Sequence, residues 1–167
     1  MRLRRFEAED ALKIASWIKN EREFRLWSAD RFGEYPFDPD IMVSQYAESV
    51  KTGAFFPLTA VDDEGGTIGH LILRYTDEAH KTVRFGFVIV DRDLRGCGTG
   101  REMLALAKKY AAEVLHAERL SLGVFERNEA AARCYRAAGF TQIVGDEELC
   151  HMLGETWKCI EMEMLLP

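Results

Sequence analysis

The amino-acid sequence predicts an α/β protein in which one mixed sheet carries helices on both faces. The first observation is an apolar, β-branched and aromatic run at residues 83–90, which is typical of a buried strand. A glycine cluster and then an amphipathic helix follow this run directly. The second observation is that segments within residues 55–75 and 140–166 alternate between polar and apolar side chains, as strands do. Because the helical segments lie between strands and each has an apolar stripe, they can cover both faces of the sheet.

The first third of the chain predicts one strand and two helices. Residues 1–6 alternate apolar and basic side chains and predict the first strand. Residues 11–18 have a helical apolar pattern that follows two acidic residues. Residues 20–40 mix aromatic and acidic side chains with helix breakers and are expected to be the least regular segment. A second helix is expected to begin at Asp38-Pro39, since a proline suits the first helical position, and to end near Gly53.

The rest of the chain alternates strands with two more helices. Turn residues or glycines bound the strands, which are expected at residues 55–62, 67–75, 83–90, 119–125, 140–149 and 156–166. One helix follows the glycine cluster and ends near Leu115. Another, residues 129–138, begins after Asn128, which is a favourable N-cap residue. With a loop at residues 151–155 between the last two strands, the predicted order is β-α-α-β-β-β-α-β-α-β-β.

Composition places the chain among soluble globular proteins. Its 167 residues fit a single domain over residues 1–167, and 47% hydrophobic with 30% charged residues is ordinary for this class. The net charge of −6 argues against nucleic-acid binding, which usually needs a basic patch, and is compatible with a cationic partner. No apolar run is long enough to span a membrane and no signal region follows Met1, so we expect a cytoplasmic protein.

The chain has four cysteines: Cys97, Cys134, Cys150 and Cys159. Their spacing matches no zinc-binding pattern, and we expect no metal site. Cys134 and Cys159 fall in helical and strand patterns that suit reduced, buried thiols. Cys97 lies in the glycine cluster and is the thiol that we expect to be most open to alkylation.

The glycine cluster at residues 95–101 predicts a phosphate-binding turn. Glycines allow sharp turns and a close approach to a ligand, and the first turn of a helix offers unpaired N–H groups at the positive end of the helix dipole. No Lys-Ser or Lys-Thr follows the glycines, which excludes a P-loop, and the spacing does not match the G-x-G-x-x-G dinucleotide fingerprint. A glycine-rich turn that binds no ligand is the alternative interpretation.

The motif that remains is Arg95-x-x-Gly98-x-Gly100, which resembles the (Q/R)-x-x-G-x-(G/A) signature of the GNAT acetyltransferase superfamily. In that family this loop holds the pyrophosphate of acetyl-coenzyme A. The stretch from Asn128 to Phe140 is similar to the family's N-x-x-A-x-x-x-Y-x-x-x-G-F motif, with Tyr135 at the tyrosine position. The predicted order of elements also matches the family. The resemblance implies a GNAT-like fold, whose mixed sheet is mostly antiparallel.

The resemblance also implies where the co-substrate acetyl-coenzyme A binds. The residues that correspond to the pyrophosphate loop are Arg95, Gly96, Cys97, Gly98, Thr99, Gly100 and Arg101. The pantetheine arm would bond the backbone of the central strand at Val88, Ile89 and Val90. The side chain of Asn128 would contact the same arm, and the hydroxyl of Tyr135 would face the sulfur. A backbone N–H near Val88 would also point at the thioester oxygen, where charge builds during acyl transfer.

The resemblance gives Tyr135 a catalytic role and leaves the general base open. A tyrosine hydroxyl can protonate the departing thiolate, whose conjugate acid has a pKa of about 8.5 by analogy with cysteine. The alternative is a core aromatic whose hydroxyl bonds a backbone carbonyl. Arg84 and Gly123 stand where some family members carry a glutamate base, so the proton must leave through water or another side chain. The candidates are Glu23, Asp30, Glu34, His70 and Glu126.

The first helices form one wall of the acceptor pocket in the family, which would place residues 21–40 there. The rings and carboxylates of this segment would suit a cationic amine through electrostatic and cation–π attraction. Ordinary core packing is the alternative for its aromatic residues, which are Phe24, Trp27, Phe32 and Tyr35.

The predicted function is an N-acetyltransferase in which the primary amine of a small molecule or peptide attacks acetyl-coenzyme A directly. An acyl-coenzyme A-binding module without turnover and an acyltransferase that uses another acyl group are the alternatives. The acceptor, the acyl-chain preference and the oligomeric state, with a homodimer among the options, stay open.

Overall fold

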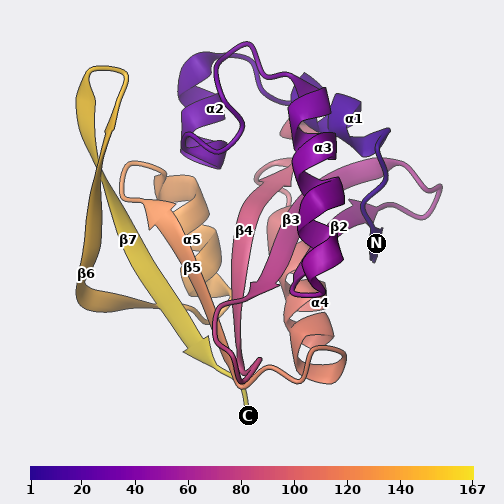
Figure 1. The fold of residues 1–167 in the computed structure, drawn as a ribbon, viewed down its shortest axis with the longest axis vertical. Coiled ribbons are helices and arrows are strands. Elements are labelled where there is room, and N and C mark those ends of the chain that lie inside the picture. The colour runs from indigo at the N-terminus through magenta and orange to yellow at the C-terminus, as the bar shows by residue number, and fades with distance from the viewer.

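The computed structural model describes residues 1–167 and contains one seven-stranded sheet, in the order β1-β2-β3-β4-β5-β7-β6 (Figure 1). Only β4 and β5 run parallel, and every other neighbouring pair is antiparallel. The strands are β1 (Arg2–Arg5), β2 (Phe55–Val61), β3 (Thr67–Tyr75), β4 (Thr82–Val90), β5 (Arg119–Phe125), β6 (Thr141–Met152) and β7 (Glu155–Leu165). The predicted mixed, mostly antiparallel sheet is therefore confirmed.

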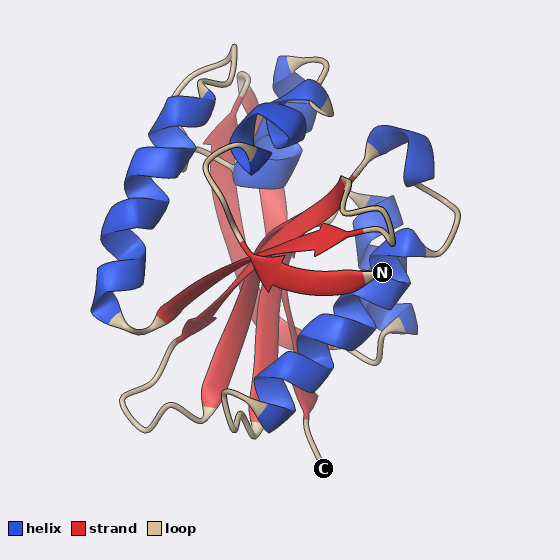
Figure 2. Ribbon diagram, turned by 90° about the vertical axis from the view of Figure 1, so that its right-hand side faces the viewer, coloured by secondary structure: helices blue, strands red, loops and turns tan.

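Helices cover both faces of the sheet, as the sequence predicted (Figure 2). They are α1 (Asp10–Ser16), α2 (Glu21–Ser28), α3 (Pro39–Ser49), α4 (Thr99–Glu113) and α5 (Glu129–Ala137), with short 3-10 turns η1 (Val50–Thr52) and η2 (Arg92–Leu94). The larger core cluster joins α4 and α5 to one face, and the smaller one joins α1, α2 and α3 to the other. None of these helices is both long and apolar enough to cross a membrane.

The segment expected to be least regular contains a helix, so the predicted order with two helices before the second strand is wrong. Helix α2 begins after Asn20, whose side chain accepts a hydrogen bond from the Glu23 N–H at 2.9 Å. Phe24 and Ser28 form its buried side. The helix is only eight residues long and mixes charged with aromatic residues, which hid its periodicity. The observed order is β-α-α-α-β-β-β-α-β-α-β-β.

The hairpin of β6 and β7 is longer than the sequence indicated. Pairing continues to Met152 opposite Glu155, so the expected loop at residues 151–155 is wrong. The turn consists of Leu153 and Gly154, both in the left-handed region at φ 53° and 70°. Two left-handed residues make the tight turn that matches the twist of a hairpin, and leucine at the first of them gave no sequence signal for it. The hairpin extends along one side of the molecule (Figure 1).

The parallel pair β4 and β5 separates soon after it begins. Only three residues of β4, from Thr82 to Arg84, pair with β5. Farther along, Gly86 pairs with Ile72 of β3 and Ile89 pairs with His70. Two residues of β4, Phe87 and Val88, therefore lie opposite the single residue Leu71, which is a β-bulge. Phe87 lies in this bulge with a left-handed φ of 49°. Beyond Arg84 and Ser121, β4 and β5 therefore diverge and leave a gap between them.

Asp10 ties the first strand and helix to the sheet. Arg4 binds its carboxylate with two hydrogen bonds of 2.7 and 2.8 Å, and the Glu7 N–H donates a third. The hydroxyls of Thr59 and Thr67 donate the last two, from β2 and β3. Burial alone would raise the pKa of Asp10, but these hydrogen bonds lower it to about 2. From the sequence, Asp10 was expected only to favour the start of the helix.

The Asp10 network predicts a specific acid sensitivity. Because the pKa of Asp10 is depressed in the folded state, its contribution to stability is complete above the unfolded value near 4 and is lost as pH falls toward 2. Asp10→Asn should lower the free energy of unfolding at pH 7 by roughly 2 kcal/mol, as measured by urea denaturation. The variant should lose less stability than the wild type between pH 5 and 2, and parallel pH curves would contradict this account.

Candidate functional site

The glycine turn and the start of α4 present a row of free N–H groups. Gly96 and Gly98 have left-handed φ angles of 78° and 91°, which turn the chain between η2 and α4. None of the backbone N–H groups from residue 96 to residue 101 donates a hydrogen bond within the protein. A Cβ atom built on either glycine would meet nothing within 4 Å, so the space around the turn is open. Such a row at a helix N-terminus suits an anion with several oxygens, such as a diphosphate.

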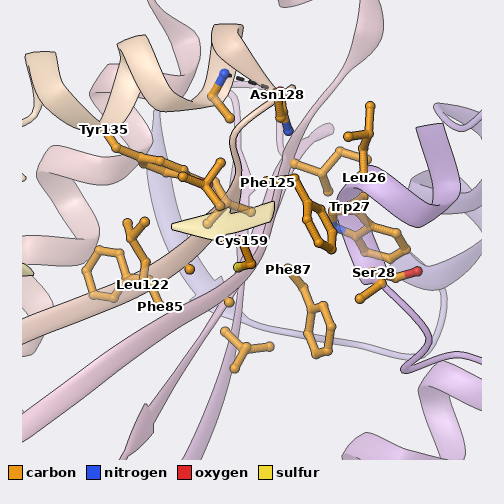
Figure 3. A pocket seen from close by; sticks show the side chains of 18 of the residues that line it. Leu26, Trp27, Ser28, Phe85, Phe87, Leu122, Phe125, Asn128, Tyr135 and Cys159 are labelled. Atoms are coloured by element: carbon orange, nitrogen blue, oxygen red, sulfur yellow. Dashed lines mark hydrogen bonds between the residues drawn. The ribbon is translucent and has the colours of Figure 1, made fainter. Parts of the chain in front are cut away.

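A cleft of about 1570 Å³ leads from this turn into the gap between β4 and β5. Its walls come from α2, α5 and the β6–β7 hairpin, and Figure 3 shows some of the side chains that line it. Most of the site residues expected from the sequence line this one cleft: Val88, Ile89, Val90, Arg95, Gly96, Gly98, Gly100, Arg101, Asn128 and Tyr135. Cys97 and Thr99 belong to the same turn and do not line the cleft.

Tyr135 reaches from α5 into the cleft (Figure 3). It is 7% exposed and also packs in the larger core cluster, edge-on to Phe140 at a centroid distance of 6.2 Å. No group of the protein hydrogen-bonds its hydroxyl, unlike the core tyrosine that was the alternative interpretation. Burial raises the pKa of Tyr135 well above its ordinary value, with Cys134 as a smaller cause. The phenol therefore stays protonated at physiological pH and is a hydrogen-bond donor.

Asn128 is the N-cap of α5, as expected from the sequence. Its side-chain oxygen accepts a hydrogen bond from the Ala131 N–H at 3.4 Å (Figure 3). The side-chain oxygen of Asn128 thus accepts the capping hydrogen bond of α5, while its amide nitrogen can still donate a hydrogen bond at the edge of the cleft. The capping role fixes the position from which this donor acts.

The two positions where relatives carry a glutamate base lie together on the cleft floor. Arg84 forms a two-pronged ion pair with Glu161 of β7, at 2.5 and 2.7 Å. A Cβ atom on Gly123 would lie 2.7 Å from the guanidinium and 2.8 Å from the carboxylate. The ion pair therefore fills the space that a side chain at residue 123 would need.

The candidate bases differ in their access to the cleft. Glu23 and Asp30 line it, whereas Glu34, His70 and Glu126 do not. His70 is fully buried, its Nε2 lies 2.9 Å from the hydroxyl of Tyr46, and burial lowers its pKa to about 3.

Glu23 is a poor candidate base despite its place in the cleft. Burial alone would raise its pKa, but hydrogen bonds from the Lys19 N–H and from Arg92 lower it. Asp30 has an 81% exposed side chain and lies 3.7 Å from Arg31. Glu23 is thus held as a carboxylate by its donors, and Asp30 is a surface group rather than a buried one.

The aromatic residues of segment 21–40 mostly form core. Phe24 and Phe32 are fully buried, and Tyr35 packs against Phe24. Only Trp27 of the four lines the cleft, so a cation–π wall made by all of them is not present. Arg74, Glu161 and the hairpin residues from Leu149 to Met152 also line the cleft, and none of them was expected there from the sequence. Strand alternation alone could not locate these residues, because they converge from distant parts of the sheet.

Comparison with known proteins places this geometry in a family. The model of the acetyltransferase (GNAT) family matches residues 20–140. The chain belongs to the GNAT family. The match spans the cleft from α2 to the end of α5, and so includes the glycine turn, the divergent strands and Tyr135.

Solved structures with the same fold include spermidine N-acetyltransferase from Vibrio cholerae in complex with coenzyme A and spermine. That chain is 22% identical, with a TM-score of 0.82 and coverage of 98% of this chain and 94% of the other. A chimeric form of the Vibrio cholerae enzyme is 20% identical, with a TM-score of 0.77 and coverage of 99% and 96%. These similarities establish that this chain has the GNAT fold along nearly its whole length.

The bulge in β4 makes a prediction about stability. The ring of Phe87 packs 4.6 Å from that of Phe32 and 6.0 Å from that of Trp27, which holds its backbone in the left-handed region. Phe87→Ala and Phe87→Gly both lose this packing, but only glycine adopts the conformation freely. The glycine variant should therefore be more stable than the alanine variant by about 1 kcal/mol in urea denaturation.

Phe85 is the matched control for this comparison, because it lies on the same strand and its φ is not left-handed. At Phe85 the order of the two variants should be reversed, since glycine is the more costly residue in a regular strand. A glycine variant less stable than alanine at both positions would contradict the proposed strain at Phe87.

Proposed function

We propose that this protein is an N-acetyltransferase that transfers the acetyl group of acetyl-coenzyme A to a primary amine of a small molecule or peptide. The observation that carries this proposal is a single cleft that joins two features. At one end lies the row of free N–H groups at residues 96–101, and the cleft continues into the gap between β4 and β5 beside the buried phenol of Tyr135. A diphosphate and a long arm ending in a thioester fit this combination of an anion site and a slot. Membership of the GNAT family supports the same activity.

The residues that line the cleft are compatible with the pyrophosphate and the pantetheine arm of acetyl-coenzyme A. The pyrophosphate would accept hydrogen bonds from the N–H groups at residues 96–101. The pantetheine arm would lie along Val88, Ile89 and Val90, where β4 has no pairing with β5, and the Asn128 amide would donate to it. The similar enzyme from Vibrio cholerae, whose structure contains coenzyme A, supports this assignment.

The chemistry then requires one bond to form and one to break. The acceptor amine, after losing a proton, attacks the thioester carbonyl carbon, and a backbone N–H near Val88 stabilises the charge on the carbonyl oxygen. As the C–S bond breaks, Tyr135 gives its proton to the leaving thiolate, and the proton lost by the attacking ammonium restores the phenol through solvent. The products are an N-acetylated amine and free coenzyme A. The neutral state that burial imposes on Tyr135 suits this donor role.

Tyr135→Phe tests this mechanism. The variant keeps the ring in the core and removes only the proton donor, so turnover should fall by about 10²–10⁴-fold, measured as thiol release from acetyl-coenzyme A. Stabilisation by coenzyme A in a thermal melt should be unchanged, which serves as the control for folding and binding. Equal turnover of the variant and the wild type at every pH would remove the role of Tyr135.

A broad acceptor panel tests the function itself. Thiol release should be seen with at least one class among amino acids, polyamines, aminoglycosides and peptide N-termini. Thermal stabilisation by acetyl-coenzyme A, with no thiol released in the presence of any amine, would favour a non-catalytic acyl-coenzyme A-binding module. The absence of a glutamate at positions 84 and 123 would then explain the lack of turnover. Replacing acetyl- by propionyl- or succinyl-coenzyme A would detect a different acyl preference.

A further inference from the structure

The floor of the cleft carries an arginine that has no acidic partner. Arg74 on β3 lines the cleft, and no carboxylate lies within ion-pairing distance of it. Its cross-strand neighbour on β4 is Arg84, so two like charges stand directly opposite each other. Glu161 neutralises only one of them, because both of its oxygens are bound by Arg84. Arg74, an exposed residue that lines the cleft, therefore presents to the cleft a positive charge that no carboxylate of the protein pairs with.

Other groups on this side of the cleft do not cancel that charge. Burial, then Arg84, then Arg31 lower the pKa of Arg74, and Glu161 opposes them only as the smallest contribution. Arg31 also lines the cleft, and its contact with Asp30 is a surface pair at 3.7 Å, which contributes little. Two cleft carboxylates remain: Glu148 is exposed on β6, and Glu23 is bound by Arg92. The field at Arg74 is therefore set mainly by the neighbouring arginines.

A second hydrogen-bond donor that lines the cleft also lacks a partner. The indole nitrogen of Trp27 is buried and donates to no group of the protein, although Trp27 lines the cleft. In Figure 3 the edge of the ring that carries this nitrogen is turned toward Phe125 and the middle of the cleft. An indole N–H and a guanidinium can only donate, so a ligand that pairs with either of them must offer an oxygen or another acceptor. A protonated polyamine offers neither an anionic charge nor a hydrogen-bond acceptor.

We propose that the acceptor carries a carboxylate in addition to its amine, and that Arg74 binds this carboxylate. This inference rests on the proposed acetyltransferase function and specifies its substrate class. Arg74 stands opposite Arg84, which precedes Val88 by four residues, or at most about 13 Å, because the bulge at Phe87 shortens the strand. Since an arginine side chain spans part of that distance, several bonds must separate the amine from the carboxylate. The side-chain amine of lysine, or the N-terminus of a short peptide, meets this requirement.

The test compares matched acceptors that differ only in the carboxylate. Lysine is paired with cadaverine, ornithine with putrescine, and a dipeptide with its C-terminal amide, so that free amino acids and peptides are distinguished. With the wild type, kcat/KM for thiol release should be higher for the carboxylate member of a pair by about 10-fold or more, because a charge-assisted pair with arginine is lost in the other member. Equal or better turnover of the amines without a carboxylate would overturn the inference and leave the proposed function standing.

Variants at Arg74 locate the effect. Arg74→Gln should lower kcat/KM for the carboxylate acceptors by about 10–100-fold, through KM, and leave their decarboxylated partners unchanged or improved. Arg74→Lys should restore part of the loss, since it keeps the charge and loses the planar fork. The variant should be at least as stable as the wild type, because it removes the like charge opposite Arg84. Arg5→Gln, at an exposed position outside the cleft, is the charge-matched control.

A binding measurement keeps the inference testable without turnover. If no acceptor releases thiol, the proposed function fails, and the protein saturated with coenzyme A is instead melted with each acceptor pair. Stabilisation by lysine but not by cadaverine, lost in Arg74→Gln and retained in Arg5→Gln, would support the carboxylate site by itself. Equal melting temperatures with both members, or an equal loss in both variants, would overturn it.

Discussion

The short pairing between β4 and β5 is the constraint on which the cleft depends. A parallel pair normally continues for the length of its strands, because each further residue adds hydrogen bonds. Here the pairing stops at Arg84 and Ser121, while β4 runs on to Val90 and β5 to Phe125. The backbone lost from the ladder is what a long polar arm can bind. The gap between β4 and β5 therefore exists at the cost of hydrogen bonds that a longer parallel pair would form.

The aromatic cluster under α2 and α3 helps to maintain the divergence. Phe87 departs from ordinary strand geometry, and its ring is held by Phe32 and Tyr46 on the face opposite α5. Tyr46 is fixed in turn by its hydrogen bond to the buried His70. Because this cluster anchors β4 on one face and α4 covers the other, the strand does not close against β5. The first helices thus help to maintain the gap between β4 and β5, and α2 also forms part of the cleft wall.

How much of this could be predicted depends on how local each feature is. The glycine turn, the Asn128 cap and most strand bounds follow from neighbours in the sequence, and the structure agrees with them. Helix α2 was missed because its eight residues are too few to establish a period among charged and aromatic side chains. The Asp10 network, the Arg84–Glu161 pair and the charge at Arg74 join residues on different strands, and no local pattern marks them. The aromatic residues of segment 21–40 suggested a cationic ligand until the fold showed Phe24 and Phe32 buried in the core.

The residues that could select the acceptor are harder to predict from sequence than the residues of the family motifs. The glycine turn and the segment around Tyr135, to which we assign cofactor binding and acyl transfer, are continuous stretches of sequence. The cleft floor is assembled from three strands, and its charge depends on which residues meet there. At Gly123 the missing side chain makes room for a guanidinium and a carboxylate that relatives with a glutamate at this position could not place in the same way. The common fold with spermidine acetyltransferases at 20–22% identity therefore does not transfer their acceptor, because a shared fold leaves the residues of the cleft floor free to differ.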